Sequence, residues 1–182
     1  LENVKNIFGE FLDIPIDYAV IIDFQTFEAV IDELGGIWVD VDMDMRYVDN
    51  ADGTNINLKK GYQKLNGKQA LDFVRYRKSN RGTADSSDIS RNERQQKVIA
   101  AVIEELSSVK SITSLDNIFE AVGEHVQTDI PKAQIKSLIR TYAGISVENV
   151  EFIKLEGSWR SPYIYIDPES LEKAKGALKS KL

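Results

Sequence analysis

Apolar residues recur at helical spacing along much of the chain. Near the N-terminus, for example, Val4, Ile7 and Phe11 fall on one side of a helix. Gly35-Gly36 supplies a C-terminal stop for a later stretch, and Pro168 suits the first turn of another. The pattern predicts helices over residues 2–12, 26–34, 66–74, 88–106, 114–126 and 131–143, and a last helix that opens at Asp167-Pro168-Glu169.

Strand-like patterns separate these helices. From Ile37 to Arg46 apolar and polar residues alternate strictly, which is typical of a strand with one buried face. Asp40, Asp42 and Asp44 then fit the exposed face better than a cation site, because their spacing does not match a calcium-binding loop. Runs of β-branched and aromatic residues predict further strands over residues 17–24, 150–155 and 163–166. We therefore expect one mixed α/β domain over residues 1–182, with a central sheet flanked by helices.

Composition narrows the class of function. The chain has 182 residues, enough for one domain with a continuous core. Its formal net charge of −6 argues against a dedicated nucleic-acid-binding protein, which must neutralise phosphates. The chain has no cysteine, which excludes disulfides and thiolate metal sites. No apolar run approaches the roughly 20 residues that cross a bilayer, and Leu1 is not an initiator methionine, so we expect the natural N-terminus to lie upstream.

The charge reverses locally between Arg75 and Lys97. This segment holds seven basic and three acidic residues, a net charge of +4 within an acidic chain. Planar guanidinium groups grip phosphate oxygens in pairs, so the segment is a candidate anion site. The alternative at this point is a solvated basic loop. Residues 78–87 are polar and small, and we expect this loop to be mobile without ligand.

The helix predicted from Asp88 carries polar residues on an unexpected side. With Asp88 at 0°, Arg91 lies at about 300° and Gln95 at about 340°, on the stripe that also carries apolar residues further along the helix. A helix normally keeps charges away from its buried stripe, because burying an unpaired charge is costly. Asp88, Arg91 and Gln95 therefore either line a cleft or include a buried structural Asp–Arg pair.

Arg75 and Arg77 precede this helix, and their orientation depends on the backbone. If residues 75–77 are extended, both arginines share one face and Tyr76 takes the other. If the preceding helix continues, the two side chains diverge by about 200°. The sequence leaves both possibilities open.

These residues also carry a resemblance. Residues 65–71 read Leu-Asn-Gly-Lys-Gln-Ala-Leu, and an Arg-x-Arg motif follows at Arg75 and Arg77. After the variable loop comes an Asp-x-x-Arg-x-x-Arg-Gln-Gln pattern that begins at Asp88. Together with residues 17–24 and the Leu-Gly-Gly-Ile at residues 34–37, this closely resembles the LytR-CpsA-Psr family of Gram-positive envelope proteins. The resemblance is clear from about residue 14 to residue 106.

The resemblance implies a phosphotransferase. Such enzymes move a glycopolymer, such as wall teichoic acid or capsule, from a polyprenyl-pyrophosphate carrier to peptidoglycan as a phosphodiester. The pyrophosphate would then be bound by Arg75, Arg77, Arg91 and Gln95. The catalytic residues would be Asp88, as the base for the acceptor hydroxyl, and Arg91. Phosphoryl transfer depends mainly on positioning and on neutralising phosphate charge, which suits these residues.

The family pattern also contains an earlier half that this sequence lacks, so the chain is identified as the C-terminal two-thirds of such a domain. The resemblance implies that magnesium ligands and a membrane anchor belong to that missing half, that the protein lies at the extracellular face of the membrane, and that residues 1–182 contain no metal site of their own. Two alternatives remain: a polyprenyl-pyrophosphate binding module without catalysis, and a transcription regulator.

Overall fold

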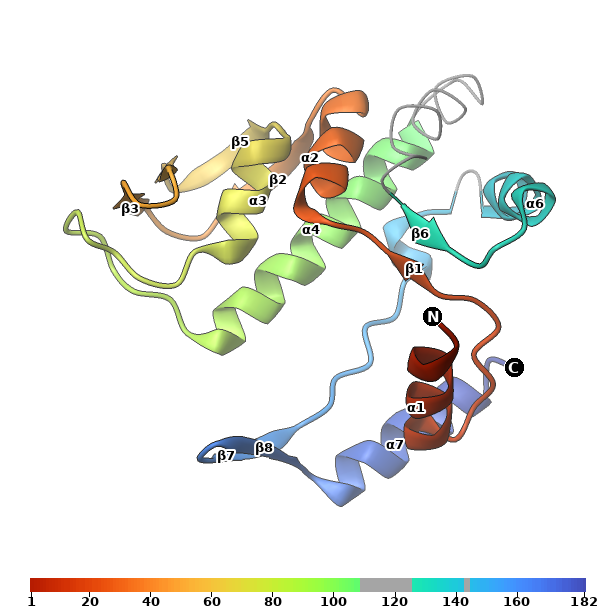
Figure 1. The fold of residues 1–182 in the computed structure, drawn as a ribbon. Helices are drawn as coiled ribbons and strands as arrows, with labels where there is room; N and C mark the ends of the chain where they lie inside the picture. The colour runs from red at the N-terminus through yellow and green to blue at the C-terminus, as the bar shows by residue number, and fades with distance from the viewer. Residues whose placement is uncertain (109–125, 143–144) are drawn as a thin grey trace. The chain divides into compact units, whose positions relative to one another are not determined.

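The computed structural model describes residues 1–108, 126–142 and 145–182 (Figure 1). It is a mixed α/β structure, as the sequence predicts. Its helices are α1 (Glu2–Leu12), α2 (Phe24–Glu33), α3 (Gly67–Arg75), α4 (Asp88–Ser108), α6 (Lys132–Tyr142), the short η1 (Val147–Asn149) and α7 (Pro168–Lys179). Its strands are β1 (Val20–Ile21), β2 (Ile37–Val41), β3 (Met45–Asp49), β4 (Thr54–Leu58), β5 (Gly61–Leu65), β6 (Gln127–Thr128), β7 (Gly157–Arg160) and β8 (Tyr163–Ile166).

The strands form two-stranded sheets. Within the part of the chain that the structure describes, no single central sheet is present, so that detail of the expected architecture is wrong. The residues divide into two compact units, one of residues 1–21, 128–134 and 151–182, the other of residues 22–127 and 135–150. Each unit has its own packing. The helix predicted over residues 114–126 lies almost wholly outside the described residues.

The core of the second unit is formed by the β2–β5 sheet, the β3–β4 sheet and three helices. β2 and β5 pair antiparallel from Ile37 opposite Leu65 to Val41 opposite Gly61. The alternation predicted for β2 is confirmed, because Ile37, Val39 and Val41 are buried and the residues between them are exposed. Helix α4 contacts β2, and α3 contacts both α2 and α4. The buried cluster comprises Ile31, Ile37, Val39, Val41, Met45, Ile56, Leu58, Leu65, Ala70, Phe73, Tyr76, Val98 and Ala101.

The strand predicted over residues 37–46 is in fact two strands with a turn between them. Asp44 explains the break, because its carboxylate accepts hydrogen bonds from the Lys60 backbone N–H (2.8 Å) and from Lys59 Nζ (3.0 Å). β3 then pairs antiparallel with β4, with Met45 opposite Leu58. The sequence pattern does not predict β4 or β5.

Helix α3 begins where the sequence indicates. Asn66 accepts a hydrogen bond from Gln69 N–H (2.9 Å), and the Gln69 side chain accepts one from Asn66 N–H (3.0 Å), which forms a reciprocal cap. Gly67 is required by packing against α2, since a Cβ there would lie 2.2 Å from the Glu28 carbonyl oxygen. This close approach fixes the start of the helix whose other end carries Arg75.

Two other strand predictions are wrong. The predicted strand over residues 17–24 ends early because Asp23 caps α2, accepting a hydrogen bond from Thr26 N–H at 2.7 Å. The segment from Val150 to Leu155 is not a strand, because no described strand pairs with it and a strand needs a hydrogen-bonded neighbour.

In the first unit α1 contacts α7 (Figure 1). Helix α1 runs over the residues predicted for it, and α7 begins where it was predicted to begin. Asp167 caps α7, with Pro168 in its first turn.

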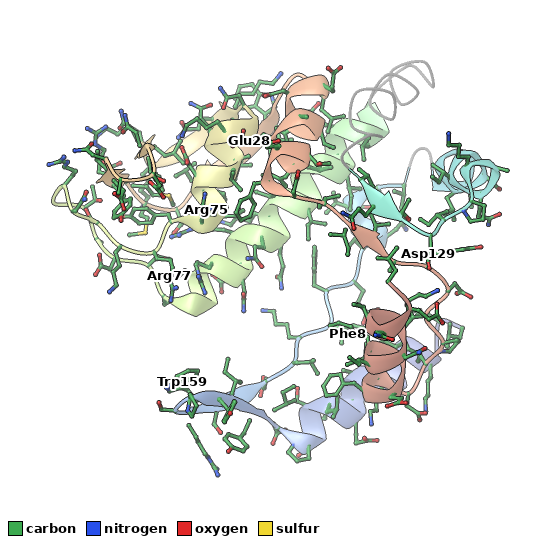
Figure 2. The ribbon with its side chains drawn as sticks, viewed as in Figure 1. Phe8, Glu28, Arg75, Arg77, Asp129 and Trp159 are labelled. Atoms are coloured by element: carbon green, nitrogen blue, oxygen red, sulfur yellow. The ribbon has the colours of Figure 1, made fainter. Side chains whose placement is uncertain are left out.

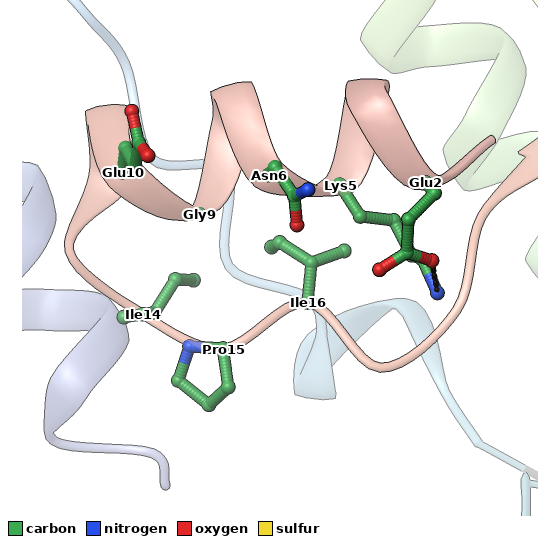
Figure 3. Close-up of a pocket in the computed structure, with 8 residues that line it drawn as sticks. All are labelled: Glu2, Lys5, Asn6, Gly9, Glu10, Ile14, Pro15 and Ile16. Carbon is green, nitrogen blue, oxygen red and sulfur yellow. Dashed lines mark ion pairs between the residues drawn. The ribbon is translucent and has the colours of Figure 1, made fainter.

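A shallow pocket of about 320 Å³ lies between α1 and residues 14–16 (Figure 3). Lys5 borders it and forms ion pairs with Glu2 (3.1 Å) and Asp129 (2.7 Å). β7 and β8 form an exposed antiparallel hairpin.

Candidate active site

Arg75 and Arg77 line one pocket in the second unit. It has a volume of about 390 Å³ and lies against the β3–β4 hairpin and the end of α3. Three cationic and two acidic side chains border it, with a hydroxyl group from a tyrosine and one from a threonine. The lining residues are Tyr47, Asp52, Thr54, Ile56, Asp72, Arg75, Arg77 and Lys78.

The end of α3 decides how the two arginines are presented. Arg75 is the last residue of the helix, and Tyr76 at the C-cap has an extended backbone (φ −56°, ψ 124°). Of the two possibilities that the sequence leaves open, the extended one is therefore correct. Both arginines are exposed and line the pocket, whereas Tyr76 is buried. Figure 2 labels Arg75 and Arg77. The Tyr76 hydroxyl donates to the Ala84 carbonyl (2.7 Å) and also lies 2.9 Å from Thr83 Oγ1.

The acids of the pocket differ in environment. Burial raises the pKa of Asp72 above its usual value, although Lys68 at 2.7 Å opposes this effect. Hydrogen bonds from Thr54 lower the pKa of Asp52, and the charge of Arg75 lowers it further. The Arg75 guanidinium carbon also lies 4.8 Å from the centre of the Phe24 ring. The pocket thus offers a cationic surface that an anion with several oxygens can bind.

The buried stripe of α4 differs from the predicted one. Arg94, Val98 and Ala101 are buried, while Gln95 and Ile99 are exposed and Arg91 is half-buried at the edge of the stripe. The prediction that Arg91 and Gln95 share the buried stripe is therefore wrong for Gln95, whereas Arg91 lies at the edge of that stripe. Neither residue is among those that line the pocket of Arg75 and Arg77. The side chain of Asp88 lies outside the described residues, so its predicted role remains a prediction.

This helix does contribute to a buried aspartate–arginine pair. The pair joins Arg94 of α4 to Asp42, which follows β2. The Arg94 side chain is 1% exposed. Its Nε and Nη2 donate to the two carboxylate oxygens of Asp42 at 2.8 and 2.7 Å. Nη1 donates to Ser86 Oγ at 2.9 Å, and the rings of Phe73 and Tyr76 lie beside the guanidinium. Such a fork uses the planar geometry of arginine, which lysine cannot reproduce.

The Asp42–Arg94 pair makes stability depend on pH. Burial raises the pKa of Asp42, but the hydrogen bond and charge of Arg94 outweigh it, so the pKa lies below the ordinary value of 3.8. The stabilisation is therefore complete at pH values well above 3.8 and is lost as the pH falls through the lower folded-state value. We expect the wild-type protein to lose more stability between neutral pH and about pH 3 than Asp42→Asn, which has no carboxyl group there to protonate. Urea titrations across this range test the expectation, which equal pH slopes for both proteins would contradict.

The loop expected to be mobile is attached to the edge of β3. Asn80 donates to the Val48 carbonyl (2.6 Å) and accepts from Val48 N–H (3.0 Å), as a neighbouring strand would. Ser79 Oγ donates to the Arg46 carbonyl (3.0 Å), and Arg46 N–H donates to Thr83 (3.1 Å). These bonds were not predicted, because small polar residues carry no periodic signal of the surface that they bind.

The chain is similar to known proteins of one family. The model of the LytR_cpsA_psr family matches residues 2–180. The chain belongs to this family. One similar protein is the polyisoprenyl-teichoic acid–peptidoglycan teichoic acid transferase TagV of Bacillus subtilis, 35% identical over all of this chain and 46% of its own length. Another is the corresponding transferase TagT of Bacillus subtilis, 32% identical over 95% of this chain and 53% of its own length.

Solved structures of family members agree. The crystal structure of Bacillus subtilis TagV matches with a TM-score of 0.79 and 34% identity, over 98% of this chain and 69% of that one. A structure of TagT bound to LI-WTA matches with a TM-score of 0.73 and 28% identity, over 100% of this chain and 68% of that one. The chain spans about half the length of the curated relatives that it matches.

Several residues that line the pocket were not predicted from the sequence. Tyr47, Asp52 and Thr54 line the pocket from the β3–β4 hairpin, which was not recognised as a hairpin. Asp72 and Lys78 lie within one to three residues of the predicted arginines, and proximity in sequence could have suggested them. None of the described helices combines the length and apolarity needed to cross a membrane.

Proposed function

We propose that the pocket of Arg75 and Arg77 binds the pyrophosphate of a polyprenyl-linked glycopolymer, and that the protein transfers the polymer to peptidoglycan. The observation that carries this proposal is the presentation of both arginines to one pocket by the end of α3. Two guanidinium groups and Lys78 match the charge of a pyrophosphate with several oxygens. The names of TagV and TagT, which are teichoic acid transferases, support the choice of substrate.

The chemistry proposed is phosphoryl transfer, in which the phosphoanhydride bond of the pyrophosphate is broken and a phosphodiester bond is formed. A peptidoglycan hydroxyl, for which we propose the 6-hydroxyl of N-acetylmuramic acid, attacks the phosphorus that bears the polymer. A new P–O bond forms, the P–O bond to polyprenyl phosphate breaks, and the polymer remains attached as a phosphodiester. Arg75 and Arg77 neutralise the charge on the phosphate oxygens, and Asp88 accepts the proton of the hydroxyl.

Arg91 and Gln95 have a more limited role in this proposal. Gln95 is exposed and Arg91 is half-buried, and both lie on α4 beyond the residues that line the pocket. We propose that they contact the pyrophosphate or polymer outside the pocket of Arg75 and Arg77.

Magnesium does not fit the described residues by themselves. No group of three potential metal-ligating side chains occurs among them, and the two acids of the pocket face three cationic groups. Asp72 is additionally paired with Lys68. We derive no step through a metal ion and propose that any magnesium ligands lie outside this stretch of sequence. An extracellular, membrane-associated location likewise remains part of the proposal.

A test separates transfer from binding. Asp88→Asn is nearly isosteric and removes the proposed base, so we expect transfer to fall by about a hundredfold or more while pyrophosphate binding stays within about twofold. Transfer of a lipid-linked teichoic acid precursor to peptidoglycan and calorimetric binding of inorganic pyrophosphate are the two measurements. They use the intact protein, together with the 182-residue chain.

The outcomes distinguish the alternatives. Binding without any transfer by the wild-type protein would favour a binding module, for which the cationic pocket alone is sufficient. Normal transfer by Asp88→Asn would exclude Asp88 as the base. Asp85→Asn is a suitable control, because Asp85 is an exposed acid of the loop just before α4 and accepts a hydrogen bond from Ser79 N–H at 2.8 Å.

A further inference from the structure

The buried Arg94 contacts both ends of the loop that follows the pocket arginines. Its Nη1 lies 3.4 Å from the Tyr76 carbonyl oxygen, between Arg75 and Arg77 in sequence, and 2.9 Å from Ser86 Oγ. The Ser86 backbone N–H in turn donates to the Arg77 carbonyl at 2.8 Å. One guanidinium thus connects the start of the loop, its end and α4.

The remaining contacts of Arg94 hold it in place. The two hydrogen bonds to Asp42 come from the turn after β2, so the guanidinium is fixed from the sheet side as well. Phe73 and Tyr76 flank it, with ring centres 5.6 and 5.8 Å from its central carbon. Because the side chain is 1% exposed and borders no part of the pocket, it has no direct access to a ligand there.

We infer that Arg94 is a positioning residue that sets the backbone of residues 75–77, and hence the spacing of the Arg75 and Arg77 side chains, through Ser86 and the Tyr76 carbonyl. This inference rests on the proposed function for the identity of the ligand. A pyrophosphate has two phosphate groups at a fixed separation, so its binding depends on the relative placement of two arginines. Orthophosphate, which one arginine can bind bidentately, depends on it less.

Two variants weaken the arrangement without removing a pocket residue. Ser86→Ala deletes the hydroxyl acceptor and leaves the Arg94–Asp42 pair intact. Arg94→Lys keeps the buried charge and one bond to Asp42, but a single ammonium cannot reproduce the fork that also reaches Ser86. The matched control is Ser146→Ala, since Ser146 is an exposed serine of the same unit whose hydroxyl donates to Asn149 Oδ1 (3.0 Å).

Hydrogen exchange and ligand binding together test the inference on the 182-residue chain. We expect the amide of residue 86 to exchange about threefold to tenfold faster in both variants, the effect of losing one hydrogen bond. Affinity for inorganic pyrophosphate, measured by calorimetry, should fall by a similar factor, while affinity for orthophosphate stays within about twofold. A merely structural role would lower both affinities together, and the change in their ratio identifies positioning.

Each outcome decides one question. Unchanged exchange at residue 86, or faster exchange with an unchanged ratio of the two affinities, would overturn the positioning role of Arg94. Failure of the wild-type chain to bind pyrophosphate more tightly than an Arg75→Ala, Arg77→Ala double variant would instead overturn the proposed function. In that case the exchange measurement still decides whether Arg94 holds the loop.

Discussion

Replacing Asp42 by alanine is expected to destabilise the protein by about 3–5 kcal/mol, because it leaves the buried Arg94 guanidinium without its counter-charge. Arg94 has no route to solvent, since only 1% of its side chain is exposed. The loss also removes two hydrogen bonds between the β2–β3 turn and α4. For a protein of this size the melting temperature should fall by about 10 °C.

Thermal melts and urea unfolding of Asp42→Ala measure this effect. Asp40→Ala is the matched control, because Asp40 lies two residues earlier, is exposed on the outer face of β2 and should change stability by no more than about 0.5 kcal/mol. Equal stability of the two variants would mean that the Arg94–Asp42 pair contributes nothing, and would remove the structural basis of the positioning role as well.

The second large effect is expected in the pocket. Replacing Arg77 by alanine should weaken pyrophosphate binding by about tenfold to a hundredfold, the range for losing charged hydrogen bonds. Arg75→Ala should cost at least as much, because Arg75 also stacks on Phe24 and its side chain is therefore held in place. Both side chains are exposed, so the melting temperature should change by no more than about 2 °C.

Calorimetry with inorganic pyrophosphate at constant ionic strength measures the loss, since surface charge effects depend on salt. Arg81→Ala controls for net charge alone, because Arg81 is an exposed arginine of the adjacent loop that does not line the pocket. A loss of affinity as large in Arg81→Ala as in Arg77→Ala would indicate diffuse attraction to the basic loop, which is the alternative left open by the charge pattern.

The helix of residues 88–108 shows where sequence reasoning is accurate and where it stops. Its bounds were predicted within two residues, because helical periodicity persists over many turns. Its buried face was misassigned because the predicted stripe includes the apolar Ile99, which is 50% exposed. A long buried arginine was not considered for the core stripe, because burial of a charge becomes acceptable only with a partner such as Asp42, which lies 52 residues away in sequence.

Some features of the pocket were likewise predicted from the sequence, and others were seen only in the structure. The Arg-x-Arg and Asp-x-x-Arg-x-x-Arg patterns indicated the family and the pocket arginines, because a motif made of neighbouring residues can be read directly from the sequence. Only the structure showed that α3 ends at Arg75, that the β3–β4 hairpin supplies the opposite wall, and that Ser79 and Asn80 bind the edge of β3.

Patterns among neighbouring residues were thus enough to predict helices α1 to α4, α6 and α7, the alternating strand at Ile37–Val41, the basic segment and the family. The tertiary structure alone decided which face of α4 is buried, which carboxylate pairs with which arginine, and where the loop of residues 78–87 lies. The physical reason is that these features depend on contacts between residues far apart in sequence, where hydrogen-bond geometry and desolvation select one partner among several of equal charge.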